Sequence, residues 1–230
     1  MKKKVAVAMS GGVDSSLTAA LLIEQGYDVI GVTMTLSEES REAGGSTAVS
    51  DAKKVADELN IPHYVVNYHK KFKDDVIKYF ISEYAKGRTP NPCVRCNNTV
   101  KFGSLLKDCL ELGADCVATG HYARIEQDEK TGRYLLKKGL DVRKDQSYVL
   151  YTLKQDVLKH FMLPLGNYSK EKTRELAGKM NLPVANKPES QEICFIPNDD
   201  YKAYLKAKEP HILKPGDIVD VNGNKLGRHE

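Results

Sequence analysis

The sequence has no tryptophan, no low-complexity tract or internal repeat, and no run of about 18 apolar residues. The missing apolar run argues against a membrane-spanning helix. The composition, 41% hydrophobic and 29% charged, argues against disorder and fibrous structure. The basic start is followed by an apolar stretch only from Val5 to Met9, too short for a signal peptide. We therefore expect a cytoplasmic globular protein with no membrane association.

The chain has few cysteines, and they are odd in number. The five are Cys93, Cys96, Cys109, Cys116 and Cys194. In a chain of 230 residues this argues against a disulfide scaffold. Cys109 and Cys116 fit core positions on a helix and a strand.

Strand and helix patterns alternate along most of the chain. Short apolar runs predict strands over residues 5–9, 28–34, 63–68 and 116–119. Helical spacing predicts helices over residues 14–25, 50–59 (with Ser50 as the N-cap), 72–84, 102–112, 155–161 and 170–180. Strand–helix–strand order with short links implies right-handed crossovers. We predict an α/β, Rossmann-like doubly wound parallel sheet.

Two further segments carry a strand–turn–strand pattern. Residues 122–139 predict a hairpin, and residues 215–227 predict another around an Asn-Gly turn. The pattern changes near residues 205–212, so we expect one domain over residues 1–208 and a small, incomplete β appendage over residues 209–230. A single hairpin cannot bury a core alone. It packs on the main domain or begins a second one.

A glycine- and serine-rich loop follows the first predicted strand. Residues 10–16 read SGGVDSS and lead into a helix. The glycines permit a tight turn, and the free N–H groups at the start of the helix favour binding of phosphate. We expect Ser10, Ser15 and Ser16 to add hydroxyl donors and Asp14 to help hold Mg²⁺. The plain alternative is a capped turn. No Walker lysine pattern or Gly-x-Gly-x-x-Gly is present, and the heptad resembles the pyrophosphate-binding loop of PP-loop ATPases, which cut ATP between its α- and β-phosphates.

Residues at two other strand ends are candidate ligand contacts. Met34 and the run Thr119, Gly120, His121 lie where open parallel sheets bind ligands. Gly120 would let a ring or ribose approach the backbone. Alternatively, Met34 belongs to the core and His121 is a hydrogen-bonded structural residue.

The Cys-x-x-Cys pair of Cys93 and Cys96 follows two prolines in a predicted loop. Such a pair can ligate metal, act in redox chemistry or present a reactive thiolate, and Arg95 and the next helix would lower a thiol pKa. Zinc normally needs four ligands, and no second pair occurs. The alternatives are a rigid loop around a buried cysteine and, for Cys194, an apolar strand residue.

Basic residues gather around the first hairpin, although the net charge of +4 does not by itself indicate nucleic acid. They are Arg133, Lys137, Lys138, Arg143 and Lys144, partly cancelled by acidic neighbours. A solvated face is the default interpretation, and contact with nucleic-acid phosphates is the alternative.

Taken together, motifs along nearly the whole chain resemble the tRNA-specific 2-thiouridylases. They are residues 10–16, Gly44 and Gly45, and residues 87–92, 96–97, 101–102, 118–123, 144–148 and 190–195. The resemblance implies ATP-dependent sulfur transfer to the wobble uridine of tRNA, through adenylylation of the base, with ATP and Mg²⁺ as cofactors. It places ATP against Ala8, Met9, Ser10, Gly11, Gly12, Val13, Asp14, Ser15, Ser16, Met34 and Gly120.

The resemblance also implies roles for the thiols and for the tRNA contacts. Cys194 would receive persulfide sulfur from a donor protein, and Cys96 would help to release it, leaving a transient disulfide. The target base would lie against Asn91, Pro92 and Cys93, and the tRNA against Lys144, Asp145 and Gln146. The partners implied are tRNA and the sulfur donor, with no DNA and no membrane.

The sequence departs from the family pattern at two places. Cys93 stands where many members have aspartate, so Cys93, Cys96 and Cys194 could hold a [4Fe-4S] cluster; we favour persulfide chemistry because three ligands leave an incomplete shell. The family usually continues into a central domain and a β-barrel, so we expect a truncated form. The competing functions are another PP-loop adenylylating ligase or amidotransferase, and an inactive nucleotide-binding module.

Overall fold

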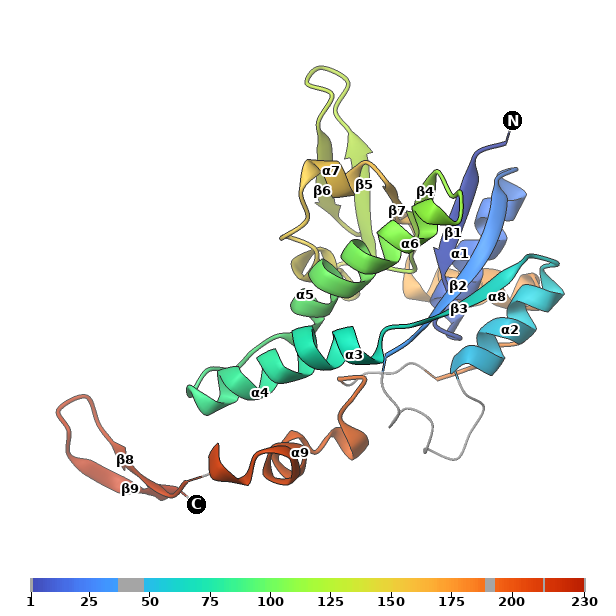
Figure 1. The fold of residues 1–230 in the computed structure, drawn as a ribbon. Helices are drawn as coiled ribbons and strands as arrows, with labels where there is room; N and C mark the ends of the chain where they lie inside the picture. The colour runs from blue at the N-terminus through green and yellow to red at the C-terminus, as the bar shows by residue number, and fades with distance from the viewer. Residues whose placement is uncertain (1, 37–47, 189–192, 213, 230) are drawn as a thin grey trace.

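The computed structural model describes residues 2–36, 48–188, 193–212 and 214–229. Figure 1 shows a twisted sheet with helices on both faces. Its five strands are all parallel, in the order β3-β2-β1-β4-β7. They are β1 (Lys4–Ala8), β2 (Asp28–Thr35), β3 (His63–Asn67), β4 (Cys116–Ala118) and β7 (Phe161–Met162). The predicted doubly wound α/β fold is confirmed.

The sheet separates two apolar clusters because alternate strand residues face opposite sides. Val5 and Val7 pack with α1 (Val13–Glu24) and α2 (Ala48–Glu58). Ala6 faces the second and larger cluster, which holds aromatic residues of the helices between β3 and β4. On the outer side, α8 (Lys170–Lys179) packs against α1. Strands covered on both faces explain the continuous apolar runs of β1 and β2.

The helices on the second face are longer and less regular than predicted. One runs as α3 (His69–Phe72), the π-helical η2 (Lys73–Ile77) and α4 (Lys78–Ala85). The other runs as α5 (Pro92–Cys96), the π-helical η3 (Asn97–Ser104) and α6 (Leu105–Glu111). The prediction of a loop around the cysteine pair is therefore wrong. Proline is compatible with the first turn of a helix, and Pro92 begins this one.

Two other sequence predictions need correction. Helix α2 begins at Ala48, so Ser50 lies inside its first turn and is not its N-cap. Phe161 belongs to strand β7, not to a helix, since α7 (Gln155–Leu158) ends before it. A strand of two residues has no periodicity that a sequence pattern can reveal.

The first hairpin is confirmed as β5 (Ala123–Gln127) and β6 (Tyr134–Lys138), which pair antiparallel. A second pair follows α9 (Tyr201–Lys208): β8 (Gly216–Val219) and β9 (Lys225–His229). Figure 1 shows this pair extending away from the sheet. Ile218, Val219 and Leu226 are exposed, so it adds nothing to the main core. Short 3-10 turns complete the chain: η4 (Ser147–Val149), η5 (Pro164–Asn167), η6 (Pro197–Asp199) and η7 (Pro210–Ile212).

The strand order places a topological switch point at the carboxyl end of β1. The chain builds β2 and β3 on one side of β1 and then returns to place β4 and β7 on the other. The loops after β1 and β4 therefore leave the sheet in opposite directions, which is where open α/β sheets bind ligands. None of the helices in the described ranges has the length and apolarity needed to cross a bilayer. Gly44, Gly45 and residues 190–192 of the predicted motifs lie outside the described residues.

Candidate active site

The loop after β1 turns sharply into helix α1. Gly11 has φ +71°, and a Cβ there would lie 2.5 Å from the carbonyl oxygen of Ala48, so only glycine fits. Gly12 is the N-cap of α1 and makes no side-chain capping bond. The first N–H groups of a helix have no partner within the helix. This loop can therefore offer backbone N–H groups to an anion.

The serines of the loop mostly hold the loop itself. Ser15 Oγ accepts the Ser10 N–H (3.1 Å) and donates to the Gly12 carbonyl (3.2 Å). Ser16 Oγ donates to the same carbonyl (2.9 Å), and both serines are buried. Of the three hydroxyls predicted as ligand donors, Ser10 alone belongs to an exposed residue. Met9 and Val13 are also buried, so these two can offer only backbone to a nucleotide.

Asp14, in the first turn of α1, is tied to the C-terminal half of the chain. Its Oδ1 accepts from Lys170 Nζ (2.6 Å) and from the Tyr122 hydroxyl (2.8 Å). Only 8% of the Lys170 side chain is exposed. Sequence reasoning missed Lys170, because nothing in a lysine on a polar helix shows which carboxylate it will meet.

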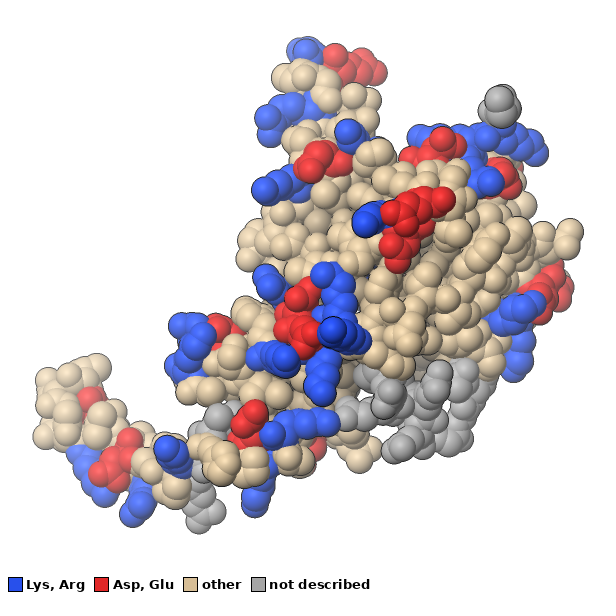
Figure 2. Space-filling model, in the orientation of Figure 1, with Lys and Arg blue, Asp and Glu red and all other residues tan. Residues whose placement is uncertain are grey.

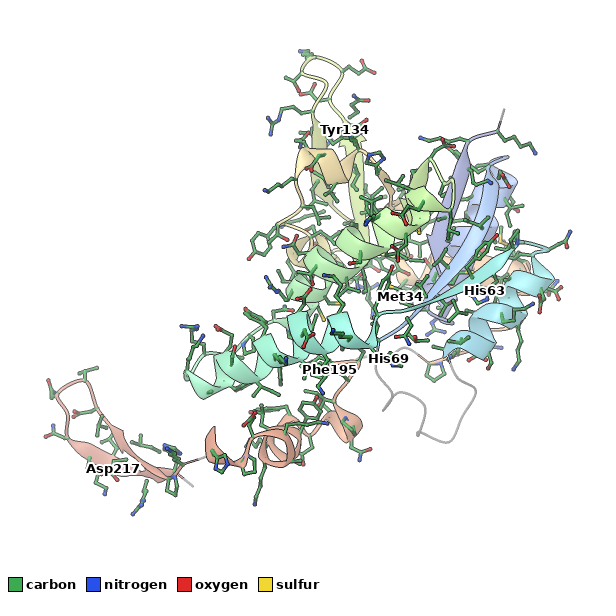
Figure 3. All side chains as sticks on the ribbon, viewed as in Figure 1. Met34, His63, His69, Tyr134, Phe195 and Asp217 are labelled. Carbon is green, nitrogen blue, oxygen red and sulfur yellow. The ribbon has the colours of Figure 1, made fainter. Side chains whose placement is uncertain are left out.

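Gly120, after β4, packs against the same turn. A Cβ on Gly120 would lie 2.9 Å from the Asp14 backbone and from the Ser15 nitrogen. Helix α1 thus fills the side of Gly120 on which a side chain would stand, and the approach of a ring or ribose to its backbone stays a prediction. Met34, near the end of β2, is half-buried against the larger core cluster (Figure 3).

His121, next to Gly120, has a structural role. Its Nδ1 lies 2.8 Å from the Thr119 hydroxyl, and its ring packs against Phe102. Burial, with the Lys101 ammonium nearby, lowers the pKa of His121 to about 3, so the ring is neutral.

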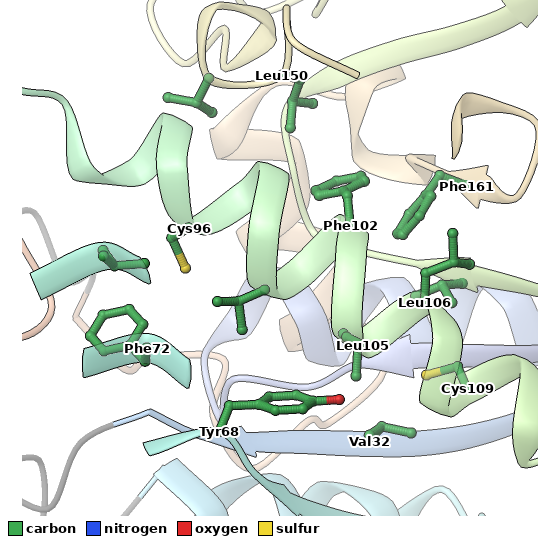
Figure 4. Close-up of a cluster of buried hydrophobic side chains, with 14 of the residues drawn as sticks. Val32, Tyr68, Phe72, Cys96, Phe102, Leu105, Leu106, Cys109, Leu150 and Phe161 are labelled. Atoms are coloured by element: carbon green, nitrogen blue, oxygen red, sulfur yellow. The ribbon is translucent and has the colours of Figure 1, made fainter. Parts of the chain in front are cut away.

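The cysteine pair lies on α5, at the start of the long helix. Asn91 is the N-cap, and its Oδ1 accepts from the Cys93 N–H (3.0 Å) and the Val94 N–H (3.3 Å). Cys93 is exposed, whereas Cys96 is 6% exposed and points into the core beside Phe72 (Figure 4).

Cys194 reaches the same region through its neighbour Phe195. The Phe195 ring is buried between Phe72 (5.6 Å between ring centres), Phe80 (5.4 Å) and Tyr204 (5.6 Å). Figure 3 places Phe195 beside helix α3. Cys194 itself is exposed at the surface. Phe195 therefore fastens Cys194, an exposed residue whose sulfur still has protein packed around it, next to the cluster that buries Cys96.

The thiols lie close enough to change one another's pKa. Burial raises the pKa of Cys96 to about 11, the Lys101 ammonium opposes this, and the neighbouring Cys194 and Cys93 thiols raise it further. The pKa of Cys194 is also raised, first by the protein packed around its sulfur, while Lys101 again opposes the shift. All five cysteines are free thiols. Cys109 and Cys116 are buried in the core as predicted.

Arg95 does not lower the pKa of Cys96 or Cys194, and both pKa values are raised. Arg95 Nε donates to the Asp75 carbonyl (3.2 Å), and its guanidinium lies over the Tyr79 ring (5.7 Å). Lys101 is the cation that acts on Cys96 and Cys194 instead. A π-helix has about 4.4 residues per turn, so residues five apart lie near the same face. Lys101 follows Cys96 by five positions, in the π-helical segment that begins directly after Cys96.

The segment predicted to contact tRNA is firmly built. Asp145 Oδ1 accepts the Gly139 N–H (2.9 Å), and its Oδ2 accepts the Ser147 hydroxyl (2.7 Å). Although burial opposes it, these bonds lower the Asp145 pKa. Gln146 exchanges hydrogen bonds with the Tyr122 backbone. Asp145 and Gln146 thus hold the loop in place, whereas Lys144 is half-buried at its edge.

No three His, Cys, Asp or Glu side chains come close enough to hold a metal ion in the part of the chain that the structure describes. The arrangement of Cys93, Cys96 and Cys194 seen here therefore does not fit an iron–sulfur cluster.

The sheet order, with a glycine-serine loop at the switch point, defines an α/β protein with a Rossmann-like, doubly wound fold. Two solved structures share this fold. The U34-tRNA thiolase NcsA from Methanococcus maripaludis with its [4Fe-4S] cluster aligns with a TM-score of 0.53 at 20% identity, over 92% of this chain and 69% of that one. A 4-thiouridine synthetase in complex with RNA and ATP aligns with a TM-score of 0.55 at 18% identity, over 91% and 51%.

The family follows from the sequence profile that matches residues 3–198, described as the tRNA methyl transferase HUP domain. The chain belongs to this family. It is 55% identical to the tRNA-specific 2-thiouridylase MnmA of Carboxydothermus hydrogenoformans and 51% identical to that of Clostridioides difficile, over its whole length. The predicted resemblance to the 2-thiouridylases is confirmed. The chain spans 65% of the length of each of these two relatives.

Proposed function

We propose that this chain carries the nucleotide- and sulfur-handling part of an ATP-dependent tRNA 2-thiouridylase, a sulfurtransferase acting on the wobble uridine. The observation that carries the proposal is the convergence of Cys96 and Cys194 on a fold whose switch point holds the glycine-serine loop. The partners are tRNA and a persulfide donor protein, and the compartment is the cytoplasm.

The site favours sulfur transfer over the methyl transfer that the family's description names. Methyl transfer does not require two protein thiols that can form a disulfide with each other. Two thiols from distant segments, fastened together by Phe195, suit the passage of a sulfur atom between them.

The loop residues fit the phosphates of ATP. The positive φ of Gly11 and the uncapped start of α1 leave N–H groups for oxygen atoms of the phosphates. Mg²⁺ would arrive with the phosphates, and Asp14 is the carboxylate nearest to them in sequence. In the proposed reaction the uracil 2-oxygen attacks the α-phosphorus, and the bond to the β-phosphate oxygen breaks with its electrons leaving on pyrophosphate. AMP on the uracil is then the leaving group.

The two thiols supply the electrons that the sulfur transfer requires. The terminal sulfur of a Cys194 persulfide attacks C2 of the uracil, and AMP departs. The Cys96 thiolate then attacks the Cys194 sulfur, which leaves sulfur on the base and a Cys96–Cys194 disulfide. The transferred sulfur gains the two electrons that the thiols lose. A dithiol reductant must restore the thiols before the next turnover.

A surface beside the predicted tRNA segment suits RNA. Tyr148 is 60% exposed and Tyr151 71% exposed, and Arg143 and Lys144 precede them. Exposed aromatic rings stack on bases, and nearby cations attract phosphates. On the hairpin itself, positive and negative side chains are mixed (Figure 2), as expected of a solvated face. We therefore place the tRNA contact at the tyrosines and Lys144.

Thiolation of a tRNA transcript by the purified chain, with ATP and a persulfide donor, tests the proposal. Cys96→Ser and Cys194→Ser should each abolish 2-thiouridine, measured by mass spectrometry of digested tRNA, but retain tRNA-dependent pyrophosphate release. Cys109→Ala, a buried cysteine away from the site, is the control. Thiolation that survives both serine variants would refute the sulfur roles. ATP binding without any tRNA-dependent pyrophosphate release would indicate an inactive module.

The RNA surface has its own test. Tyr148→Ala and Tyr151→Ala should each weaken tRNA binding by about 5- to 150-fold, since a stacked base is worth about 1–3 kcal/mol. Tyr→Phe at the same positions keeps the ring and should bind as the parent does. Equal affinity of the alanine and phenylalanine variants would exclude stacking.

A further inference from the structure

The proposed phosphate loop has no cation of its own. From Val5 to Ser40 the sequence contains no lysine or arginine, and the loop itself carries the acidic Asp14. Yet the proposed reaction expels pyrophosphate, which gains negative charge as the α–β bond breaks. Stabilising such developing charge usually requires a cation held near the leaving group. Apart from the Mg²⁺ that would arrive with ATP, any such cation comes from another part of the chain.

Lys187 reaches the backbone of the loop from a distant segment. Its Nζ donates to the Gly11 carbonyl (3.0 Å) and to Asp51 Oδ2 (2.6 Å). Asp51 is a buried residue in the first turn of α2, and the buried Val184 anchors the Lys187 segment to the core cluster beneath that helix. The ammonium is thereby held against the backbone of the glycine turn.

Lys187 differs from Lys170, the other lysine near the loop. Lys170 is almost fully enclosed, donates to Asp14 and lies 5.5 Å from the centre of the Tyr122 ring. It neutralises Asp14 and has little room to move. The Lys187 side chain is 36% exposed on a flexible stem, so its ammonium can turn from Asp51 to a phosphate while staying beside the loop.

We propose that Lys187 binds the β- and γ-phosphates of ATP and stabilises the departing pyrophosphate. This inference rests on the proposed function, since it assumes that the loop holds ATP. Asp51 holds the ammonium when no nucleotide is bound. Lys187 thus brings to the loop a positive charge that residues 5–40 do not contain.

A purely structural role for Lys187, as a support for the Gly11 turn, makes a different prediction. A distorted turn would weaken every ligand of the loop, including AMP, whose single phosphate is the α-phosphate. A cation for the leaving group affects ligands that carry the β- and γ-phosphates. The comparison of ATP, inorganic pyrophosphate and AMP therefore separates the two roles.

Calorimetric titration of Lys187→Gln and Lys187→Arg with these three ligands is the test. We expect Lys187→Gln to bind ATP and pyrophosphate about 10- to 100-fold more weakly, the usual effect of losing one charge-assisted bond, with AMP binding within about twofold. Lys187→Arg should recover most of the affinity. Lys172→Gln, an exposed lysine paired with Glu175, is the matched control and should resemble the parent.

Two results would overturn the inference. Equal losses for ATP and AMP in a Lys187→Gln protein of unchanged melting temperature would assign the residue to loop support. Unchanged ATP affinity would remove any role. If the parent protein itself binds no ATP, the proposed function fails first. If the parent binds ATP and thiolates tRNA while Lys187→Gln behaves identically, only the inference about Lys187 fails.

Discussion

Replacing Phe195 by alanine should detach Cys194 from Cys96 while leaving the nucleotide half of the site intact. Phe195 is the largest side chain that joins the Cys194 segment to the aromatic cluster of Phe72, Phe80 and Tyr204. Ile193 and Ile196 add smaller contacts with the same cluster. The loop after β1 lies at the sheet and has no contact with that ring among the described packing clusters. The two halves should therefore respond differently.

The size of the effect follows from the burial of the ring. A buried Phe→Ala replacement costs about 3–5 kcal/mol, and each edge-to-face aromatic pair adds about 0.5–1.5 kcal/mol to ring packing. At about 1.4 kcal/mol per tenfold, docking of the segment should weaken by about 100-fold or more. The leucine of Phe195→Leu fills most of the volume of the phenylalanine ring, so this variant should lose much less docking free energy.

Disulfide trapping measures this docking without relying on turnover. Diamide takes two electrons and two protons from a thiol pair, and the Cys96–Cys194 crosslink is quantified by peptide mass spectrometry. We expect rapid crosslinking in the parent. The crosslinking rate should decrease modestly in Phe195→Leu and about 100-fold in Phe195→Ala, because weaker docking lowers the effective concentration of one thiol near the other. Pyrophosphate release with tRNA should stay within about twofold in all three.

An unchanged crosslinking rate in Phe195→Ala would refute this reasoning, because the segment would then be held by other contacts. Loss of pyrophosphate release together with a large fall in melting temperature would show that Phe195 supports the whole domain. The leucine variant separates the loss of packing volume from the loss of the aromatic ring.

Three further outcomes are expected. Burial raises the Cys96 pKa to about 11, so the rate of its alkylation by iodoacetamide should rise about tenfold per pH unit up to that pH. Lys101→Met should lower this rate at a given pH, because it removes the cation that favours the thiolate. A rate that levels off near pH 8.5 would contradict the effect of burial. Gly120→Ala should lower the free energy of unfolding by about 1–3 kcal/mol in urea titration and weaken ATP binding, because its Cβ would meet the first turn of α1; unchanged values would mean that the helix yields freely. Asp14→Asn should lower the free energy of unfolding by about 1.5–3 kcal/mol, because it leaves the enclosed Lys170 ammonium without its carboxylate. Adding Lys170→Met to the Asp14→Asn protein should restore part of that free energy. Additive losses would show that the two groups act independently.

Local patterns were enough to predict the parallel sheet and the position of the loop. Apolar runs mark strands buried on both faces, and the Gly-Gly turn requires a conformation that few other residues adopt, so these features can be read from neighbours in the chain. The cysteine helix and strand β7 were not predicted. A proline-led helix with a π-helical segment breaks the usual spacing, and a strand of two residues is defined only by its pairing with β4.

What the amino-acid order determined by itself was the class of fold and the chemical types of group available: a glycine turn, several thiols and scattered cations. Which groups meet was decided by tertiary packing. Phe195 brings Cys194 to Cys96, Lys101 and not Arg95 acts on both thiols, and Lys170 and Lys187 reach opposite ends of one short loop. Such partnerships join residues distant along the chain, and their free energies depend on burial and separation, which no local pattern encodes.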